Sequence, residues 1–122
     1  MNKLLLTVSL TLTFMAFSLH ADPQRDIDES TVILTGKVHE SCVELKVGES
    51  VEYTFESDAL LSYNVHYHAG EEIIFPVTEH EAINESNAFT AEADQVYCLM
   101  WTNSSDDQVT VRYSYKLRDP AG

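Results

Sequence analysis

The stretch Tyr97-Cys98-Leu99-Met100-Trp101-Thr102-Asn103 decides the fold class of this chain of 122 residues. Large apolar side chains alternate in it with Cys98 and Met100, and successive side chains of a β-strand point to opposite faces of the sheet. The stretch therefore predicts a strand whose Leu99 and Trp101 face a core. Cys98 and Met100 then share the opposite face.

The same alternation recurs in short runs along the chain. It is clearest in residues 109–117, 51–55 and 61–67, and turn residues such as Gly36, Gly48 and Gly70 separate the runs. About eight short strands without a long helix predict an all-β domain over residues 31–118, an antiparallel, jelly-roll-like β-sandwich. The apolar stripes predict a core of Tyr53, Phe55, Tyr63, Val65, Tyr67, Leu99, Trp101, Val111 and Tyr113.

Three segments fall outside this strand pattern. Residues 22–30 are polar and have no periodic apolar face, so we expect a flexible leader. Residues 119–122 form a short tail. Residues 79–87 are the least regular part of the domain, and we expect a loop or one short helical turn there.

Residues 1–21 carry the features of a secretory signal peptide. Lys3 is followed by no charged residue up to Ala21, and the stretch is rich in Leu, Phe and Thr. A short basic start, an apolar segment and a small residue before a polar start are typical of a signal that is removed after export. The strongly apolar part, residues 4–17, is shorter than the roughly 20 residues needed to span a bilayer. We expect a periplasmic or secreted protein.

The charge of the chain excludes some partners. Its 20 acidic and 7 basic residues give a net charge of −13, and loss of Lys3 with the signal peptide makes it −14. Such a surface repels phosphate backbones and anionic membranes. We therefore expect no nucleic-acid partner and no membrane association once the signal is removed.

The chain has two cysteines, Cys42 and Cys98. In an oxidising, exported compartment such a pair favours a disulfide. Both cysteines lie on the polar faces of their predicted strands, so the strand phases are compatible with a bond between them. If the thiols stayed free, Cys98 would instead be available as a metal ligand.

Several short motifs resemble the GOLD domain, the luminal β-sandwich of cargo receptors in the early secretory pathway. They are Glu40-Ser41-Cys42-Val43-Glu44-Leu45, Gly48 with Val51-Glu52-Tyr53-Thr54-Phe55, Ala88-Phe89-Thr90-Ala91 and the stretch from Tyr97 to Asn103. That family pairs an early cysteine with a late one in a Tyr-x-x-Cys-Phe-x-Asn-like strand. Here Tyr97 directly precedes Cys98, and Leu99 replaces the aromatic residue.

The resemblance spans about residues 37–117 and implies a GOLD-like sandwich. The sequence shows none of the coiled-coil stalk, transmembrane helix or sorting tail of those receptors. Because one sandwich fold can host unrelated functions, the resemblance implies the fold and does not imply vesicle trafficking.

His66 and His68 are the sharpest candidates for chemistry. They lie two residues apart on one face of a predicted strand, where two imidazoles can bind one metal ion. If that strand neighbours the strand of Cys98, Met100 could join them, and imidazole with thioether favours copper, Cu(I) in particular. The alternative interpretation is that both histidines are polar residues on a solvated face. No histidine follows Cys98, so we do not expect a blue-copper electron-transfer site.

Enzyme motifs are absent from the sequence. It contains no nucleophile elbow, phosphate-binding loop or zinc-protease motif. The predicted function is an exported, soluble binding or interaction module for a protein or small ligand, without catalytic activity. The first alternative is a periplasmic copper-binding or metal-handling protein that uses His66, His68 and Met100.

Overall fold

The computed structural model describes residues 26–120, so the expected signal peptide (residues 1–21) and the start of the expected leader lie outside the described residues. The described chain is all-β, as predicted. Its six strands are β1 (Ile27–Ile33), β2 (Val38–Leu45), β3 (Ser50–Ala69), β4 (Glu72–Thr90), β5 (Gln95–Thr102) and β6 (Val109–Arg118). Within residues 26–120, no helix is long and apolar enough to cross a membrane.

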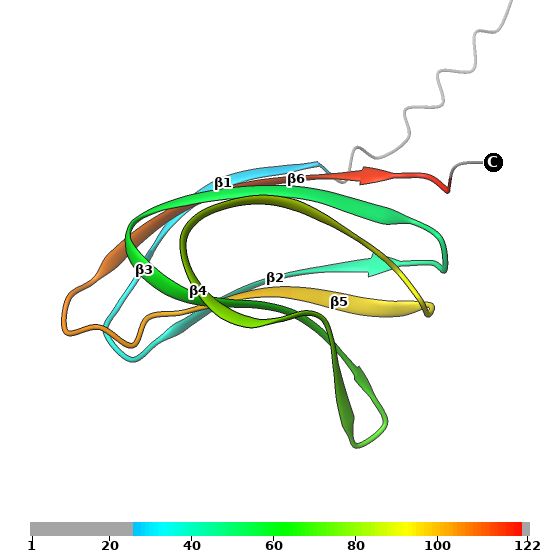
Figure 1. Cartoon of the computed structure of the whole chain (residues 1–122), viewed down its shortest axis with the longest axis horizontal. Coiled ribbons are helices and arrows are strands. Elements are labelled where there is room, and N and C mark those ends of the chain that lie inside the picture. The colour runs from blue at the N-terminus through cyan, green and yellow to red at the C-terminus, as the bar shows by residue number, and fades with distance from the viewer. Residues whose placement is uncertain (1–25, 121–122) are drawn as a thin grey trace, which may run out of the picture.

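The six strands form one antiparallel sheet in the order β1-β6-β3-β5-β2, and β4 pairs with β3. The long strand β3 belongs to both halves of this sheet, because residues 50–57 pair with β6 and residues 62–66 pair with β5. Its pairing with β4 is irregular between Glu56 and Leu61, where β3 passes from one half to the other. The sheet is therefore curled, and its two halves face each other (Figure 1).

The structure corrects the expected number of strands. We expected about eight, whereas the described residues contain six. Two apolar runs that the sequence separates, residues 51–55 and 61–67, are parts of the single strand β3. Residues 79–87, expected as a loop or helical turn, lie inside β4 and pair with β3. The first strand also begins at Ile27 and not at residue 31, so residues 27–30 of the expected leader pair with β6.

The core lies between the two facing halves of the sheet. All nine residues predicted for it are buried. Trp101 on β5 and Tyr113 on β6 have ring centroids 4.5 Å apart, although β5 and β6 are not neighbours in the sheet order. Aromatic packing across the curl therefore holds the two halves together, and the predicted inward phase of residues 97–101 is confirmed.

The β3–β4 hairpin carries two bulges that matter for the outer face. Tyr63, Val65 and Tyr67 pair with His80, Val77 and Ile74 respectively, so β4 has one extra residue opposite Asn64 and another opposite His66. Pro76 lies in the second bulge, a position that needs no backbone donor for the ladder. Bulges redirect side chains, and here Phe75 lies beside His66, with ring centroids 6.0 Å apart.

Candidate functional site

The outer face of β2, β5 and β3 brings the candidate ligands into two neighbouring rows. In the first row, Cys98 lies between Cys42 on β2 and His66 on β3. In the second row, Met100 lies between Glu40 on β2 and Asn64 on β3. The strand of His66 is therefore a neighbour of the strand of Cys98 and Met100, which is the condition that the sequence analysis set for a joint metal site.

The predicted disulfide between Cys42 and Cys98 is present. The two residues are directly opposed in the β2–β5 register, so one short bond links neighbouring strands. Cys42 is exposed and Cys98 is buried. The disulfide indicates an oxidising compartment, and it removes both sulfurs from the set of available thiolate ligands.

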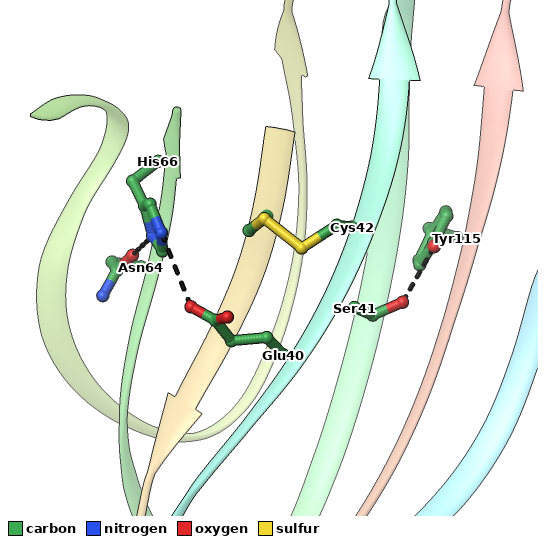
Figure 2. The surroundings of a disulfide bond; sticks show 7 residues. Glu40, Ser41, Cys42, Asn64, His66 and Tyr115 are labelled. Atoms are coloured by element: carbon green, nitrogen blue, oxygen red, sulfur yellow. Dashed lines mark hydrogen bonds and ion pairs between the residues drawn. A yellow bond between two sulfur atoms is a disulfide. The ribbon is translucent and has the colours of Figure 1, made fainter. Parts of the chain in front are cut away.

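His66 is a buried polar residue of this face. It is only 6% exposed, so the interpretation as a solvated residue is wrong for His66. Its Nδ1–H donates to Asn64 Oδ1 over 2.8 Å, and its Nε2 lies 3.5 Å from Glu40 Oε1. Figure 2 shows the imidazole between these two partners, beside the disulfide. Two polar partners and burial fix the ring in one orientation.

The other two predicted ligands, His68 and Met100, differ in their exposure and in their distance from His66. His68 is exposed, and its ring stands edge-on to that of His66 with centroids 5.4 Å apart. Met100 is half-buried and lies one row from His66 and two rows from His68. The structure therefore places His66 next to each of the other two, but sets His68 and Met100 on opposite sides of it.

Glu40 is a functional candidate that the sequence analysis missed. In the sequence it stands out only as the first residue of the motif Glu40-Ser41-Cys42-Val43-Glu44-Leu45. The signal that could have found it is its spacing, because Glu40 lies two residues before Cys42 and shares its face. Its proximity to His66, which is 26 residues away in the sequence, follows from the order of the strands and could not be read from a local pattern.

A separate polar cluster lies on the inner side of β4. The hydroxyl of Tyr53 donates to Glu85 over 2.6 Å, and His80 Nε2–H donates to the same carboxylate over 2.6 Å. The Thr78 carbonyl and the Glu85 carboxylate both favour the imidazolium and raise the pKa of His80. Burial, followed by the Glu85 carboxylate, raises the pKa of Tyr53, which keeps its hydroxyl a donor.

A similar arrangement connects β2, β6 and β1. Tyr113 donates to Glu29 over 2.7 Å, and His39 Nε2 lies 2.9 Å from the Tyr113 hydroxyl. His39 and His80 are thus half-buried and hydrogen-bonded. No pattern in the sequence around either residue predicts these hydrogen bonds. Hydrogen bonds in both clusters join different strands, so the clusters stabilise the curled sheet.

No protein-family model matches the chain, and no curated protein is significantly similar to it in sequence. The function is therefore inferred from the geometry of the described residues.

Proposed function

We propose that the protein is an exported binding module, periplasmic or secreted, that has no catalytic activity and docks a partner protein on its β3–β4 hairpin. We also infer a GOLD-like, two-layer sandwich as its fold. The facing halves of the curled sheet and the bond between an early and a late cysteine support that inference.

Exposed apolar side chains on the hairpin carry this proposal. Ile73 is 49% exposed and Phe75 is 45% exposed, and both share the outer face with His66 and His68. The hairpin projects from the body of the sheet (Figure 1). Its turn also bears two exposed carboxylates, Glu71 and Glu72. Apolar side chains beside a charged rim are typical of an interaction surface.

The charge of the hairpin defines the kind of partner. An apolar pocket on the partner would receive Ile73 and Phe75, and basic residues around that pocket would face Glu71 and Glu72. The net charge of −13 extends this attraction beyond the hairpin. Complementary charge mainly accelerates association and adds specificity, while the apolar side chains supply most of the affinity.

The double variant Ile73→Ser/Phe75→Ser tests the proposal. Immobilised wild-type protein is exposed to extracytoplasmic extract, retained proteins are identified, and their affinity is then measured with purified components. We expect the double variant to bind the retained partner about tenfold more weakly or worse, because hot-spot side chains contribute about 2 kcal/mol or more. Binding by the wild type should also weaken as salt rises.

Leu34→Ser is the matched control for this experiment. Leu34 is 56% exposed and precedes the β1–β2 turn, away from the hairpin. The control should retain the partner as the wild type does. If replacing Phe75 disturbs His66, the single variant Ile73→Ser takes the place of the double variant. Retention of the same proteins, at the same affinity, by the double variant would contradict the proposed docking surface.

Copper binding by His66, His68 and Met100 is the second candidate function. The orientation of His66 favours it, because a neutral imidazole that donates through Nδ1 presents a free lone pair on Nε2. Stoichiometric binding of Cu(I) or Cu(II) to the oxidised protein would support this candidate. The absence of binding would contradict it.

The variant His66→Gln/His68→Gln separates this candidate from a structural role. We expect it to abolish copper binding if the candidate is correct. Because His66 is buried and hydrogen-bonded, His66→Gln alone should cost about 1–3 kcal/mol of stability. His68 is exposed, so His68→Gln should change stability by no more than about 0.5 kcal/mol. Copper binding that survives in the double variant would exclude the histidine site.

A further inference from the structure

Three side chains with metal-binding atoms lie close together on the outer face of β2, β5 and β3, and His66 lies beside one of them. The carboxylate of Glu40 and the sulfurs of Cys42 and Cys98 all lie within 4.8 Å of one another. His66 lies opposite Cys98 in the register, and its Nε2 is 3.5 Å from Glu40 Oε1. Figure 2 shows the imidazole and the carboxylate turned toward each other beside the disulfide. We refer to these four residues as the outer-face cluster.

The imidazole of His66 is already held as a metal ligand would be. Its Nδ1–H donates to Asn64 Oδ1, so in the neutral ring Nε2 is an acceptor that faces the acceptor oxygen of Glu40. Two facing acceptors are stabilised when a cation lies between them. Two ligand atoms bound about 2.1 Å from a tetrahedral zinc ion are about 3.4 Å apart, close to the distance found here. Metal-bound histidines are commonly held by such a hydrogen bond from the other ring nitrogen.

The disulfide controls whether the cluster is complete, because the thiolate is the form of cysteine that binds a metal. A dithiol reductant can open the bond by exchange. Its thiolate attacks the sulfur of Cys42, the exposed residue of the pair, and Cys98 leaves as a thiolate. The second sulfur of the reductant then displaces Cys42, and the reductant becomes a disulfide. Two electrons and two protons pass from the dithiol to the cysteine pair.

We propose that reduction of the Cys42–Cys98 disulfide converts the outer-face cluster into a zinc site. The ligands are the two thiolates, His66 Nε2 and a carboxylate oxygen of Glu40. Zinc accepts this combination of sulfur, nitrogen and oxygen in tetrahedral geometry, and its binding displaces the two thiol protons. Glu40 and Cys42 are exposed, so an ion can enter from solvent.

The proposed site has a structural consequence for the three strands. The ligands come from neighbouring strands of one sheet, so side-chain rotation brings them together without a change of register. Zinc then replaces the disulfide as the link between β2 and β5, and His66 adds β3 to that link. A ligand that binds the folded state stabilises it by mass action. This site is independent of the hairpin and goes beyond the proposed binding function.

Cobalt is the probe that tests the site. The protein is reduced with a dithiol, freed of reductant without oxygen, and titrated with Co²⁺. We expect one Co²⁺ per chain, with thiolate-to-cobalt absorption in the near ultraviolet and the visible bands of a tetrahedral ion. Zn²⁺ should displace the cobalt and remove both signals. The oxidised protein should show neither signal.

Two variants of the histidine pair make the test specific. His66→Gln should weaken Co²⁺ binding by about tenfold or more, as the loss of ligand-shell groups does, and Glu40→Gln should act in the same direction. His68→Gln is the matched control, because His68 is exposed on the same face of the same strand and should bind as the wild type does. Absence of thiolate-to-cobalt absorption, or equally tight binding by His66→Gln, would overturn the proposal.

Thermal unfolding keeps the test decisive if reduction loosens the fold. Zn²⁺ should raise the unfolding midpoint of the reduced wild type and of His68→Gln, but not that of His66→Gln. Zinc that raises none of these midpoints would overturn the proposal. Copper titration of the oxidised protein is a separate experiment, so the copper candidate and the zinc site can fail independently.

Discussion

Replacing Trp101 with alanine is expected to lower the free energy of unfolding by about 3–5 kcal/mol. Trp101 is 0% exposed, and its ring centroid lies 4.5 Å from that of Tyr113 and 5.3 Å from that of Tyr63. The indole fills the space between the two halves of the curled sheet, so alanine leaves a cavity that neither half can close alone. Urea unfolding followed by far-ultraviolet circular dichroism measures the loss.

Two further variants serve as controls for the stability loss expected of Trp101→Ala. Val96 lies on the same strand and is 52% exposed, so Val96→Ala should change stability by no more than about 0.5 kcal/mol. Trp101→Phe keeps an aromatic ring and removes an Nε1–H that is buried without an acceptor among residues 26–120, so it should cost less than alanine. If Trp101→Ala behaved like Val96→Ala, the placement of the indole in the core would be wrong.

Removal of the disulfide is expected to cost about 4 kcal/mol. Cys42 and Cys98 are 56 residues apart in the sequence, and closing a loop of that size restricts the unfolded chain by about this amount in the chain-entropy model. The direct opposition of the two residues in the β2–β5 register lets the folded state keep the bond without moving a strand. Small domains have about 5–15 kcal/mol of total stability, so the loss is a large share.

The variant Cys42→Ser/Cys98→Ala, with and without reductant, measures this contribution. The urea midpoint of the oxidised wild type should fall when the protein is reduced in metal-free buffer. The midpoint of the double variant should be low from the start and unaffected by reductant. A wild-type midpoint that does not respond to reduction, with both thiols shown to be free, would contradict the predicted contribution of the bond.

The strand phases could be predicted where one side of a strand is apolar. Leu99 and Trp101 alternate with Cys98 and Met100, and in the structure the first two are buried in the core while the second two lie on the outer face. The predicted core and the disulfide followed from that alternation and from the number of cysteines. The core prediction depends only on the spacing of apolar residues along each strand. The disulfide prediction is unambiguous because each of the two cysteines has only the other as a possible partner.

The number of strands could not be predicted in the same way. Residues 79–87 have mostly exposed or half-buried side chains and no apolar stripe, although their backbone pairs with β3. Residues 57–60 interrupt the apolar alternation of β3 because the strand bends there and changes neighbours. Strands that pair through their backbone but bury few side chains, and bends within a strand, change the periodicity of apolar residues very little. Such features are therefore hard to predict from the sequence.

The candidate site shows the same limit. Alternation correctly places His66 on the outer face, but the ring is buried because a bulge in β4 brings Phe75 beside it and β2 brings Glu40. These contacts depend on strand order and register, which are long-range properties. His68 is two residues away on the same face and is exposed, so the pattern of two histidines alone did not distinguish them.

The pairing of the first strand with the last determines when the chain can fold. Ile27 of β1 lies opposite Tyr115 of β6, and residues 50–57 of β3 also require β6. Contacts between residues so far apart in the sequence form slowly, because a long loop must close first. A nascent chain therefore has no native half-sheet around β1 until the 10-residue strand β6 has been synthesised. The half of the sheet that contains β1 is therefore among the last parts of the fold to form, whereas β3 can pair with β4, and β2 with β5, before β6 is available.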